Sequence, residues 1–213
     1  MALRPKRPYH HGNLREALLD AAERLLEQEG EGALALRRIA RDAGVSHAAC
    51  YHHFDGREAL LRGLAARGFE RFGAALRDAA AGRQGLEGFL ETGVAYVGFA
   101  ARRPALFRLL FGPESAERQG HPEVAAAARA AFDGLLHGAQ AAGPGDEAEV
   151  RRRALAAWAL VHGLASLLVD GQLHPLGIEL AQHEAVTRAL LAGGPLPAGP
   201  PATSSRVGSK SPR

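Results

Sequence analysis

Apolar side chains recur at three- and four-residue intervals along most of the chain, and this periodicity constrains the fold more than any other feature. Leu14, Leu18, Ala21 and Leu25 share one face of a first segment, which ends at Gly30. Such spacing is typical of amphipathic helices, whereas a half-buried strand requires strict alternation, which we find nowhere in the sequence. The sequence therefore predicts an all-α protein.

Glycine and proline divide the rest of the chain into further segments with the same periodicity. Asn13 is suited to be the N-cap of the first helix, whose carboxylates at Glu23, Glu27 and Glu29 lie mostly outside the apolar face. We then expect helices over residues 36–43, 46–54, about 56–76, 86–101, 104–111, 123–142, 146–170 and 178–192. Residues 112–122 contain two glycines and two prolines, which indicates a loop.

The two ends of the chain differ in composition from its interior. Arg4, Lys6 and Arg7 precede the first acidic residue, and prolines among them disfavour a helix, so residues 1–12 should form a flexible basic arm. From Gly193 the chain is rich in proline, glycine and serine, so residues 193–213 should be disordered. A signal peptide and an uninterrupted membrane-spanning stretch are not recognisable, so we expect a cytoplasmic protein with no membrane partner.

Composition excludes several classes of site. Cys50 is the only cysteine, which excludes an internal disulfide and a cysteine-rich metal site. The adjacent pairs His10-His11 and His52-His53 point apart on a helix, and no carboxylate completes a ligand set, so we expect no metal. A phosphate loop, a nucleophile elbow and a paired-acid motif are also missing, which predicts no cofactor and no enzyme. The net charge of +3 permits nucleic-acid binding without requiring it.

Residues Leu36 to Phe54 have the pattern of two short helices joined by a tight turn. Ala40 is small where the helices approach, and Gly44 suits the left-handed conformation that closes the first helix. The residues expected to face inward are Ile39, Ala43, Val45, Cys50 and Phe54. Because Cys50 has this inward phase, a packed thiol is favoured over a redox switch. An ordinary helical hairpin is the alternative, but every key position falls in the register of a helix-turn-helix.

The same register leaves small and polar side chains on the outer surface of the second short helix. They are Ser46, His47, Ala48, Ala49 and His52, with Ser46 suited to be the N-cap. A helix that begins with such short side chains can enter a DNA major groove. The segment therefore has the properties of a recognition helix, and double-stranded DNA is the expected partner.

Residues Tyr51-His52-His53-Phe54, followed by Arg57-Glu58-Ala59-Leu60-Leu61, resemble the signature of the TetR family of repressors. The resemblance covers residues 13–72. It departs from the family pattern where Ala35 and Leu36 replace a capping Ser or Thr, and where Arg57 replaces the usual lysine.

This resemblance implies a role for each matching residue. The resemblance implies that Arg37, His47, Ala48 and Ala49 contact base edges. It implies that Tyr51, His53 and Arg57 contact phosphates. Arginine can donate two hydrogen bonds to guanine, histidine can contact a base edge, and alanine methyls can touch thymine methyls. Tyrosine, histidine and arginine can each donate to phosphate oxygens. With Ser46 and His52, these residues form the candidate DNA-binding set.

A second resemblance lies in the C-terminal half. The pattern Arg103-Pro104-Ala105-Leu106-Phe107, together with Trp158, His162 and Gly163, resembles a C-terminal domain named for its Trp-His-Gly motif, found in one branch of the TetR family. It implies a cavity for an unidentified small-molecule effector. The candidate pocket residues are Tyr96, Phe99, Phe107, Phe111, Phe132, Trp158 and His162.

Trp158, His162, Ala165 and Val169 share one helix face, which could be core, pocket wall or subunit interface. A buried imidazole needs a partner, so His162 should bond either a neighbouring carbonyl or a ligand. The run Arg151-Arg152-Arg153 is most simply solvent-facing.

The last two helices are apolar enough for an intersubunit four-helix bundle, as the family resemblance implies. Their apolar residues include Trp158, Leu160, Leu164, Leu167, Leu168, Leu180, Val186, Leu190 and Leu191. A two-fold homodimer predicts a palindromic operator. We thus expect a DNA-binding domain over residues 13–60 and a sensor and dimerisation domain over residues 61–192.

The function expected is that of a repressor released from its operator by a small molecule. A regulator that acts without a ligand is one alternative. An enzyme using His162 as general base is another, though it lacks a nucleophile, metal or cofactor motif.

Overall fold

The computed structural model describes residues 14–196, and every regular element in this range is a helix, which confirms the all-α prediction. The predicted basic arm at residues 1–12, the Asn13 N-cap and tail residues 197–213 lie outside the described residues.

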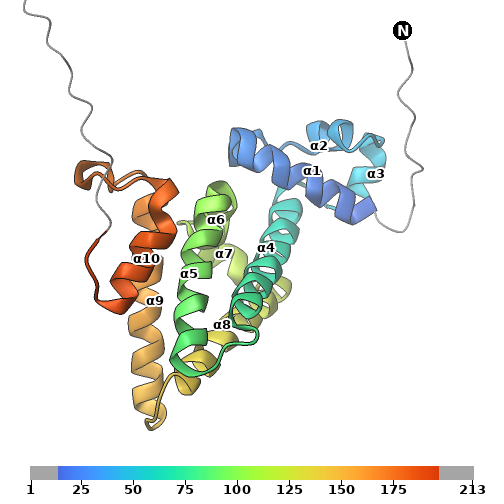
Figure 1. Cartoon of the computed structure of the whole chain (residues 1–213). Coiled ribbons are helices and arrows are strands. Elements are labelled where there is room, and N and C mark those ends of the chain that lie inside the picture. The colour runs from blue at the N-terminus through green and yellow to red at the C-terminus, as the bar shows by residue number, and fades with distance from the viewer. Residues whose placement is uncertain (1–13, 197–213) are drawn as a thin grey trace, which may run out of the picture.

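The N-terminal part of the chain consists of short helices packed around one apolar core (Figure 1). The elements are α1 (Leu14–Glu29), the 3-10 turn η2 (Glu31–Ala33), α2 (Leu36–Asp42), α3 (His47–Tyr51) and the start of α4 (Arg57–Ala80). Leu18, Leu26 and Ile39 are almost fully buried in this core. Helix α1 ends where predicted because Gly30 has a φ of +82°, a conformation that side chains with a Cβ rarely adopt.

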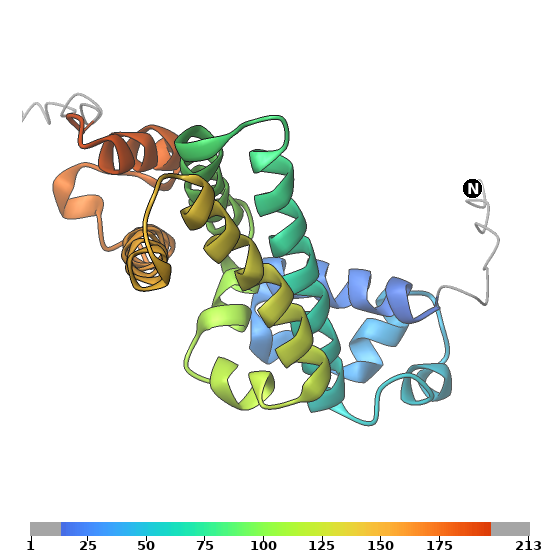
Figure 2. The same cartoon turned by 90° about the horizontal axis from the view of Figure 1, so that it is seen from below.

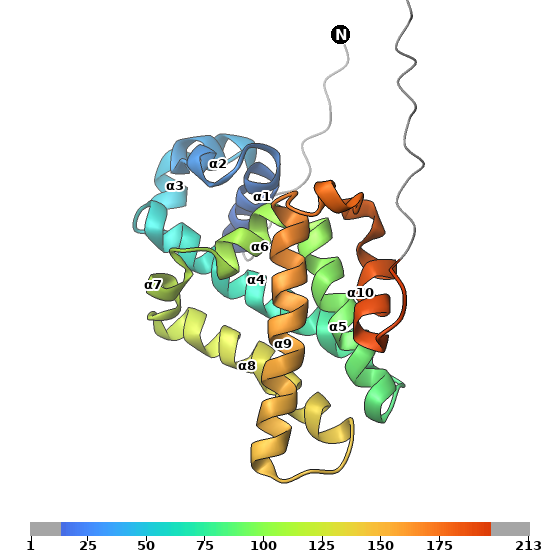
Figure 3. The ribbon, with the colours of Figure 1, turned by 90° about the vertical axis from the view of Figure 1, so that its left-hand side faces the viewer.

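The C-terminal part is a bundle centred on α5. Its elements are α5 (Gly85–Arg102), α6 (Pro104–Phe111), α7 (Ser115–Gln119), α8 (Pro122–Ala141), α9 (Glu147–Val169), η3 (His174–Leu176), η4 (Leu180–Gln182) and α10 (His183–Ala192). Helix α5 contacts α4, α6, α8, α9 and α10. Figure 2 shows α8 running alongside α4, and Figure 3 shows α9 and α10 on the outer side of the bundle.

Helix α4 joins the two parts without a break. Leu60 and Leu61 near its start are fully buried in the N-terminal core. Near its other end, the Phe72 ring lies 4.9 Å from the Tyr96 ring of α5, centroid to centroid. The predicted boundary between residues 60 and 61 therefore falls inside a helix that both parts share.

Two predicted segments differ from the structure. The expected loop at residues 112–122 contains α7, whose Arg118 is buried and bonds the Leu109 carbonyl, Glu31 and Glu114. These contacts, of which the one to Glu31 spans 87 residues, stabilise a five-residue helix between proline and glycine. The helix expected from Ile178 begins as η4, and α10 follows from His183.

The predicted solvent-facing arginine run is correct only in part. Arg151 and Arg152 are exposed and pair with carboxylates of the same helix. Arg153 instead donates to the carbonyls of Ala139 and Gly143, at 2.6 and 3.0 Å. Because these carbonyls lie near the end of α8, Arg153 caps that helix.

Candidate nucleic-acid interface

The turn between α2 and α3 has the geometry that the spacing predicts. Gly44 has a φ of +72°, and the amide of Val45 donates to the Ala40 carbonyl at 2.9 Å. Ser46 is the N-cap of α3, and its hydroxyl accepts a hydrogen bond from the Ala49 amide at 3.2 Å. The N-cap of α2 is Ala35, which makes no side-chain capping bond, as the sequence indicates. Helix α3 is therefore oriented by its own cap and by the turn.

The inner face of the helix-turn-helix is apolar, as predicted. Ile39, Cys50 and Phe54 are buried, while Ala43 and Val45 are partly buried against the same core. Burial raises the pKa of the Cys50 thiol, which keeps the thiolate scarce at neutral pH. Cys50 is thus a packed thiol.

The outer face carries the residues predicted to contact bases. Arg37, Ser46, Ala48 and His52 are exposed, and His47 and Ala49 are half-buried. The His47 ring packs edge-to-face on the Tyr51 ring, with 4.7 Å between ring centroids. A polar, sterically open surface thus surrounds the start of α3.

The residues assigned to phosphates lie at the far end of the same surface. Tyr51 and His53 are exposed. Arg57, in the first turn of α4, donates to the Glu31 carbonyl at 3.0 Å and lies 3.1 Å from a carboxylate oxygen of Glu58. Its guanidinium is therefore already engaged within the chain.

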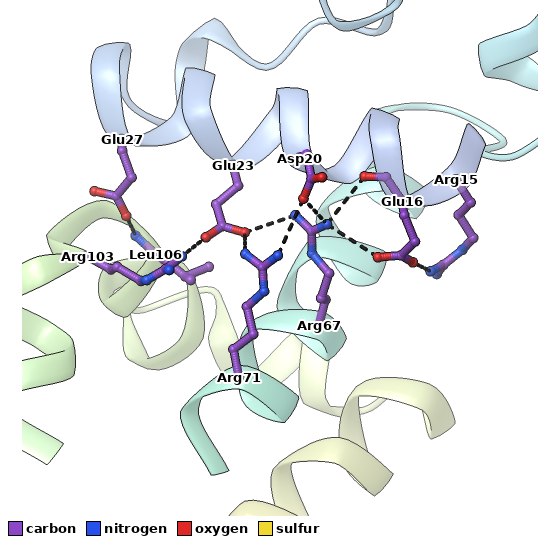
Figure 4. Close-up of polar contacts among 9 residues, drawn as sticks. All are labelled: Arg15, Glu16, Asp20, Glu23, Glu27, Arg67, Arg71, Arg103 and Leu106. Carbon is purple, nitrogen blue, oxygen red and sulfur yellow. Dashed lines mark hydrogen bonds and ion pairs between the residues drawn. The ribbon is translucent and has the colours of Figure 1, made fainter. Parts of the chain in front are cut away.

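The sequence did not predict a buried ion cluster between the two parts of the chain (Figure 4). Glu23 of α1 is only 6% exposed, and its carboxylate binds Arg67 at 2.9 Å together with Arg71 of α4 and Arg103 at the α5–α6 junction. Asp20 accepts a second bond from Arg67 at 2.8 Å. Because three arginines bind one carboxylate, α1, α4 and the start of α6 are held in fixed positions relative to one another.

A second acidic residue of α1 completes this junction. The Glu27 carboxylate accepts hydrogen bonds from the backbone amides of Ala105 and Leu106, at 3.2 and 2.8 Å. These amides belong to the first turn of α6, where a helix leaves its N–H groups unpaired and favours negative charge. Helix α6 is therefore bound to the N-terminal part through its N-terminus.

The seven candidate pocket residues form one aromatic cluster on the other side of α6. The His162 ring lies 5.4 Å from Phe111 and 5.7 Å from Phe107, and the Trp158 ring lies 5.0 Å from Phe132, between ring centroids. Phe72 of α4 joins the cluster and contacts Tyr96 and Phe99. Phe72 was not among the candidate pocket residues, because its ring partners lie 24 to 39 residues further along the chain.

A polar contact lies at the centre of this cluster. The Tyr96 hydroxyl lies 2.9 Å from Nδ1 of His162, and the Trp158 indole N–H donates to the same hydroxyl at 3.3 Å. Burial raises the pKa of Tyr96 and lowers the pKa of His162, so the phenol keeps its proton and the imidazole is neutral. The partner that His162 needs is therefore Tyr96, rather than a neighbouring carbonyl or a ligand.

A small cavity of about 40 Å³ lies beside the cluster. Three of the seven candidates, Tyr96, Phe132 and Trp158, line it, whereas Phe99, Phe107, Phe111 and His162 do not. Effector-sized sites are about 300–1,000 Å³, so this cavity alone does not accommodate one.

Large apolar side chains are exposed on α9 and α10. Leu160, Leu167 and Leu190 are about 40% exposed, and Leu155, which lines a hollow beside α8, is 62% exposed. Leu164, Leu168 and Val186, which are among the apolar residues of the last two predicted helices, are buried within the chain.

Candidate metal sites and membrane-length helices are described for residues 14–196 only. Among residues 14–196, no group of three or more His, Cys, Asp or Glu side chains is placed to hold a metal ion. In the same range, α9 alone is long and apolar enough to cross a membrane, judged by length and composition.

A helix-turn-helix followed by a larger helical domain defines a DNA-binding transcriptional regulator, and comparisons with known proteins identify its family. The family model described as bacterial regulatory proteins, tetR family, matches residues 18–64. The model described as tetracyclin repressor-like, C-terminal domain, matches residues 89–192.

Similar proteins cover most of the chain. An uncharacterised HTH-type transcriptional regulator of Mycobacterium tuberculosis is 34% identical over 158 residues, 72% of this chain and 74% of the relative. The HTH-type transcriptional regulator BetI of Rhizobium meliloti is 31% identical over 154 residues, 70% and 75% of the two chains. A solved structure of a protein with unknown function from Rhodococcus sp. RHA1 is 39% identical, with a TM-score of 0.71, covering 88% of this chain and 98% of that one.

The chain belongs to the TetR family of transcriptional regulators. The family consists of DNA-binding regulators rather than enzymes, and its members typically dimerise.

Proposed function

We propose that this regulator represses transcription by binding a palindromic operator as a homodimer, and that a small molecule releases it. The observation that carries the proposal is the exposed polar surface of α3, which a capped turn orients away from the core. The C-terminal domain is assigned to the Trp-His-Gly branch because Trp158 and His162 meet at one tyrosine. Because the family consists of DNA-binding regulators, the protein is assigned to the cytoplasm.

Base recognition is assigned to Arg37, His47, Ala48 and Ala49, with Ser46 holding the start of the recognition helix. The exposure of Arg37 supports this, because its guanidinium is available to pair with the O6 and N7 atoms of a guanine. His52 lies at the end of α3 and extends the same surface.

Tyr51, His53 and Arg57 are assigned to phosphates. Arg57 must exchange its bond to Glu31 for one to a phosphate when DNA binds. Arg118 of α7 supports this exchange because it binds the same Glu31 carboxylate at 2.7 Å and can keep that charge paired. Phosphate contacts supply affinity without sequence preference.

Release of the regulator from DNA by the small molecule is assigned to a movement of α6. The helix carries Phe107 and Phe111 of the aromatic cluster on one side. At its N-terminus, its backbone amides donate hydrogen bonds to the carboxylate of Glu27, a residue of α1. A ligand that displaces these rings shifts α6, and the shift changes the position of α1 through Glu23 and Glu27. Such a ligand acts by binding the DNA-free conformation more tightly than the DNA-bound one.

The homodimer is assigned to the exposed leucines of α9 and α10. Leu160, Leu167 and Leu190 are exposed on two adjacent helices, and burying them in a four-helix bundle removes them from water. The same contact explains why α9 is apolar although much of it is uncovered within one chain.

Arginine substitutions test the assignment of roles. In operator-binding assays, Arg37→Ala should lose about 1–3 kcal/mol of discrimination at one base pair. Arg57→Ala should weaken binding to all sequences and lower the salt dependence by about one phosphate contact. Arg38→Ala is the matched control, because Arg38 pairs with Glu29 at 2.7 Å and should not affect base preference. Equal losses on every sequence for Arg37→Ala and Arg57→Ala would contradict the division of roles.

A further inference from the structure

A large open groove adjoins the small apolar cavity. The groove lies between α4, α5 and α8 and has a volume of about 820 Å³. Leu76, Phe89, Thr92 and Ala131 line both hollows, so only side chains separate them. The groove has the volume of a small-molecule site, whereas the cavity has room for little more than one water molecule.

Phe89 forms the boundary between the two hollows. Its ring edge lies 3.0 Å from the position that a Cβ on Gly138 of α8 would occupy, so the ring rests on bare backbone. Phe89 is half-buried and is not among the rings of the central aromatic cluster. Phe89 lines both hollows, and Phe72, Tyr96 and Trp158 line only the cavity.

The groove and the cavity differ in polarity. The cavity is lined almost entirely by aliphatic and aromatic side chains. The groove contains Arg77, Arg83 and His137, against a single carboxylate among its lining residues, Asp133. A molecule that occupies both hollows therefore meets an apolar inner end and a positively charged outer end.

Arg77 is the residue that best fits a ligand contact. Its guanidinium folds over α4, with Nη1 3.1 Å from the position of a Cβ on Gly73, at the contact between α4 and α8. Within residues 14–196 it has no hydrogen-bond or ion-pair partner. Arg83, by contrast, donates to the Ala79 carbonyl at 2.8 Å and pairs with Glu87. An arginine left without a partner in a groove is available to bind an anion.

We propose that the effector is an amphipathic anion, whose negatively charged head binds Arg77 in the groove and whose apolar body lies along the groove and displaces Phe89 to widen the cavity. This rests on the proposed function, because it names the class of molecule that occupies the release site. The apolar body reaches Trp158 and Tyr96, which couples it to the aromatic rings of α6. The head group stays at the groove, where water and His137 complete its solvation.

The single tryptophan of the chain, Trp158, lines the cavity and reports on binding through its fluorescence. The full-length dimer is titrated below micelle-forming concentrations with decanoate, decyl phosphate, decanol and decylammonium. Decanoate or decyl phosphate should give a saturable change in Trp158 emission, decanol should bind about tenfold or more weakly, and decylammonium should bind most weakly. Saturation by one anion and not the other identifies the head group as carboxylate or phosphate.

Arg77→Gln should weaken anion binding about tenfold or more and leave decanol binding unchanged. The matched control is Arg129→Gln, an arginine of α8 that lines a different surface hollow, which should leave both unchanged. Phe89→Tyr, which enlarges the boundary side chain without adding a second tryptophan, should weaken anion binding. Anion affinity that is the same in the wild type and in Arg77→Gln would overturn the proposal.

Operator affinity is measured in the same titrations to separate this proposal from the proposed function. Release of DNA by decanol or decylammonium, and not by the anions, overturns the anionic class while the release mechanism stands. Saturable anion binding at Arg77 that leaves DNA affinity unchanged supports the anionic site and contradicts release through it. Release by an anion, weakened in Arg77→Gln, supports both.

Discussion

The helix-turn-helix and the C-terminal bundle present their functional side chains in opposite directions. In α2 and α3 the candidate contacts point outward, and a separate apolar layer of Ile39, Cys50 and Phe54 holds the fold. In the bundle the aromatic cluster of Tyr96, Trp158 and His162 is at once the candidate sensor and part of the core. Function and stability are therefore separable in the first region and coupled in the second.

The largest difference in unfolding free energy is expected between the substitution of a buried aromatic residue and that of an exposed one. Phe72→Ala removes a fully buried ring that contacts Tyr96, Phe99 and Phe111, and should cost about 3–5 kcal/mol of unfolding free energy. Tyr51→Ala removes a ring that is 51% exposed and should change stability by no more than about 0.5 kcal/mol while weakening DNA binding. Urea denaturation measures both variants. Similar losses of stability in the two would break the comparison.

The ion cluster at the junction should have the next largest effect. Glu23→Gln removes the charge that three arginines share, and because two of these are partly solvated, the loss should be about 2–3 kcal/mol. Glu29→Gln, on the same helix, breaks an exposed pair with Arg38 and should leave the thermal midpoint unchanged. Calorimetry at neutral pH compares the two, and equal midpoints would argue against a structural role for the cluster.

Substitutions at two helix N-caps sharpen the comparison, because each removes one side-chain capping bond, one from each region. Ser46 caps α3, and Asp146 caps α9 by accepting from the Glu149 amide at 2.9 Å. Each alanine substitution should cost about 1 kcal/mol of unfolding free energy. Only Ser46→Ala should also weaken operator binding, measured by fluorescence anisotropy. A matching loss of DNA affinity in Asp146→Ala would show that general destabilisation explains both.

The smallest effect concerns pH. Burial lowers the pKa of His162 below its ordinary value of 6.5, so the unfolded chain takes up a proton at a higher pH than the folded chain does. Stability from this residue is therefore present above about pH 6.5 and is lost as the pH falls toward the lowered folded-state pKa. His162→Gln should show a shallower decline of stability between pH 7 and 5 in urea denaturation. An unchanged slope would mean that the imidazole does not titrate differently in the two states.

The sequence predicts local structure more completely than long-range contacts. The turn at Gly44, the cap at Ser46 and the inward phase of Cys50 follow from spacing within one short segment, and all three agree with the structure. These features depend on neighbours within a few residues. The same reasoning gave the start of α4 and both ends of α6.

Features that depend on distant residues were not predictable. Glu23 looks like a surface carboxylate, because its arginine partners lie 44 to 80 residues further along the chain. Arg118 stabilises α7 through Glu31, 87 residues away, so the segment around it resembled a loop. Among the leucines of α9, only packing decides that Leu164 is covered within the chain and Leu160 is not.

Selection of DNA by the full-length protein from a random pool tests the central claim most directly, since DNA recognition by paired recognition helices underlies the whole account. We predict enrichment of an inverted repeat whose half-sites lie about one helical turn, roughly 10 base pairs, apart. Arg37→Ala should relax one position in each half-site. Enrichment of an asymmetric single site, or no enrichment above the starting pool, would contradict the account.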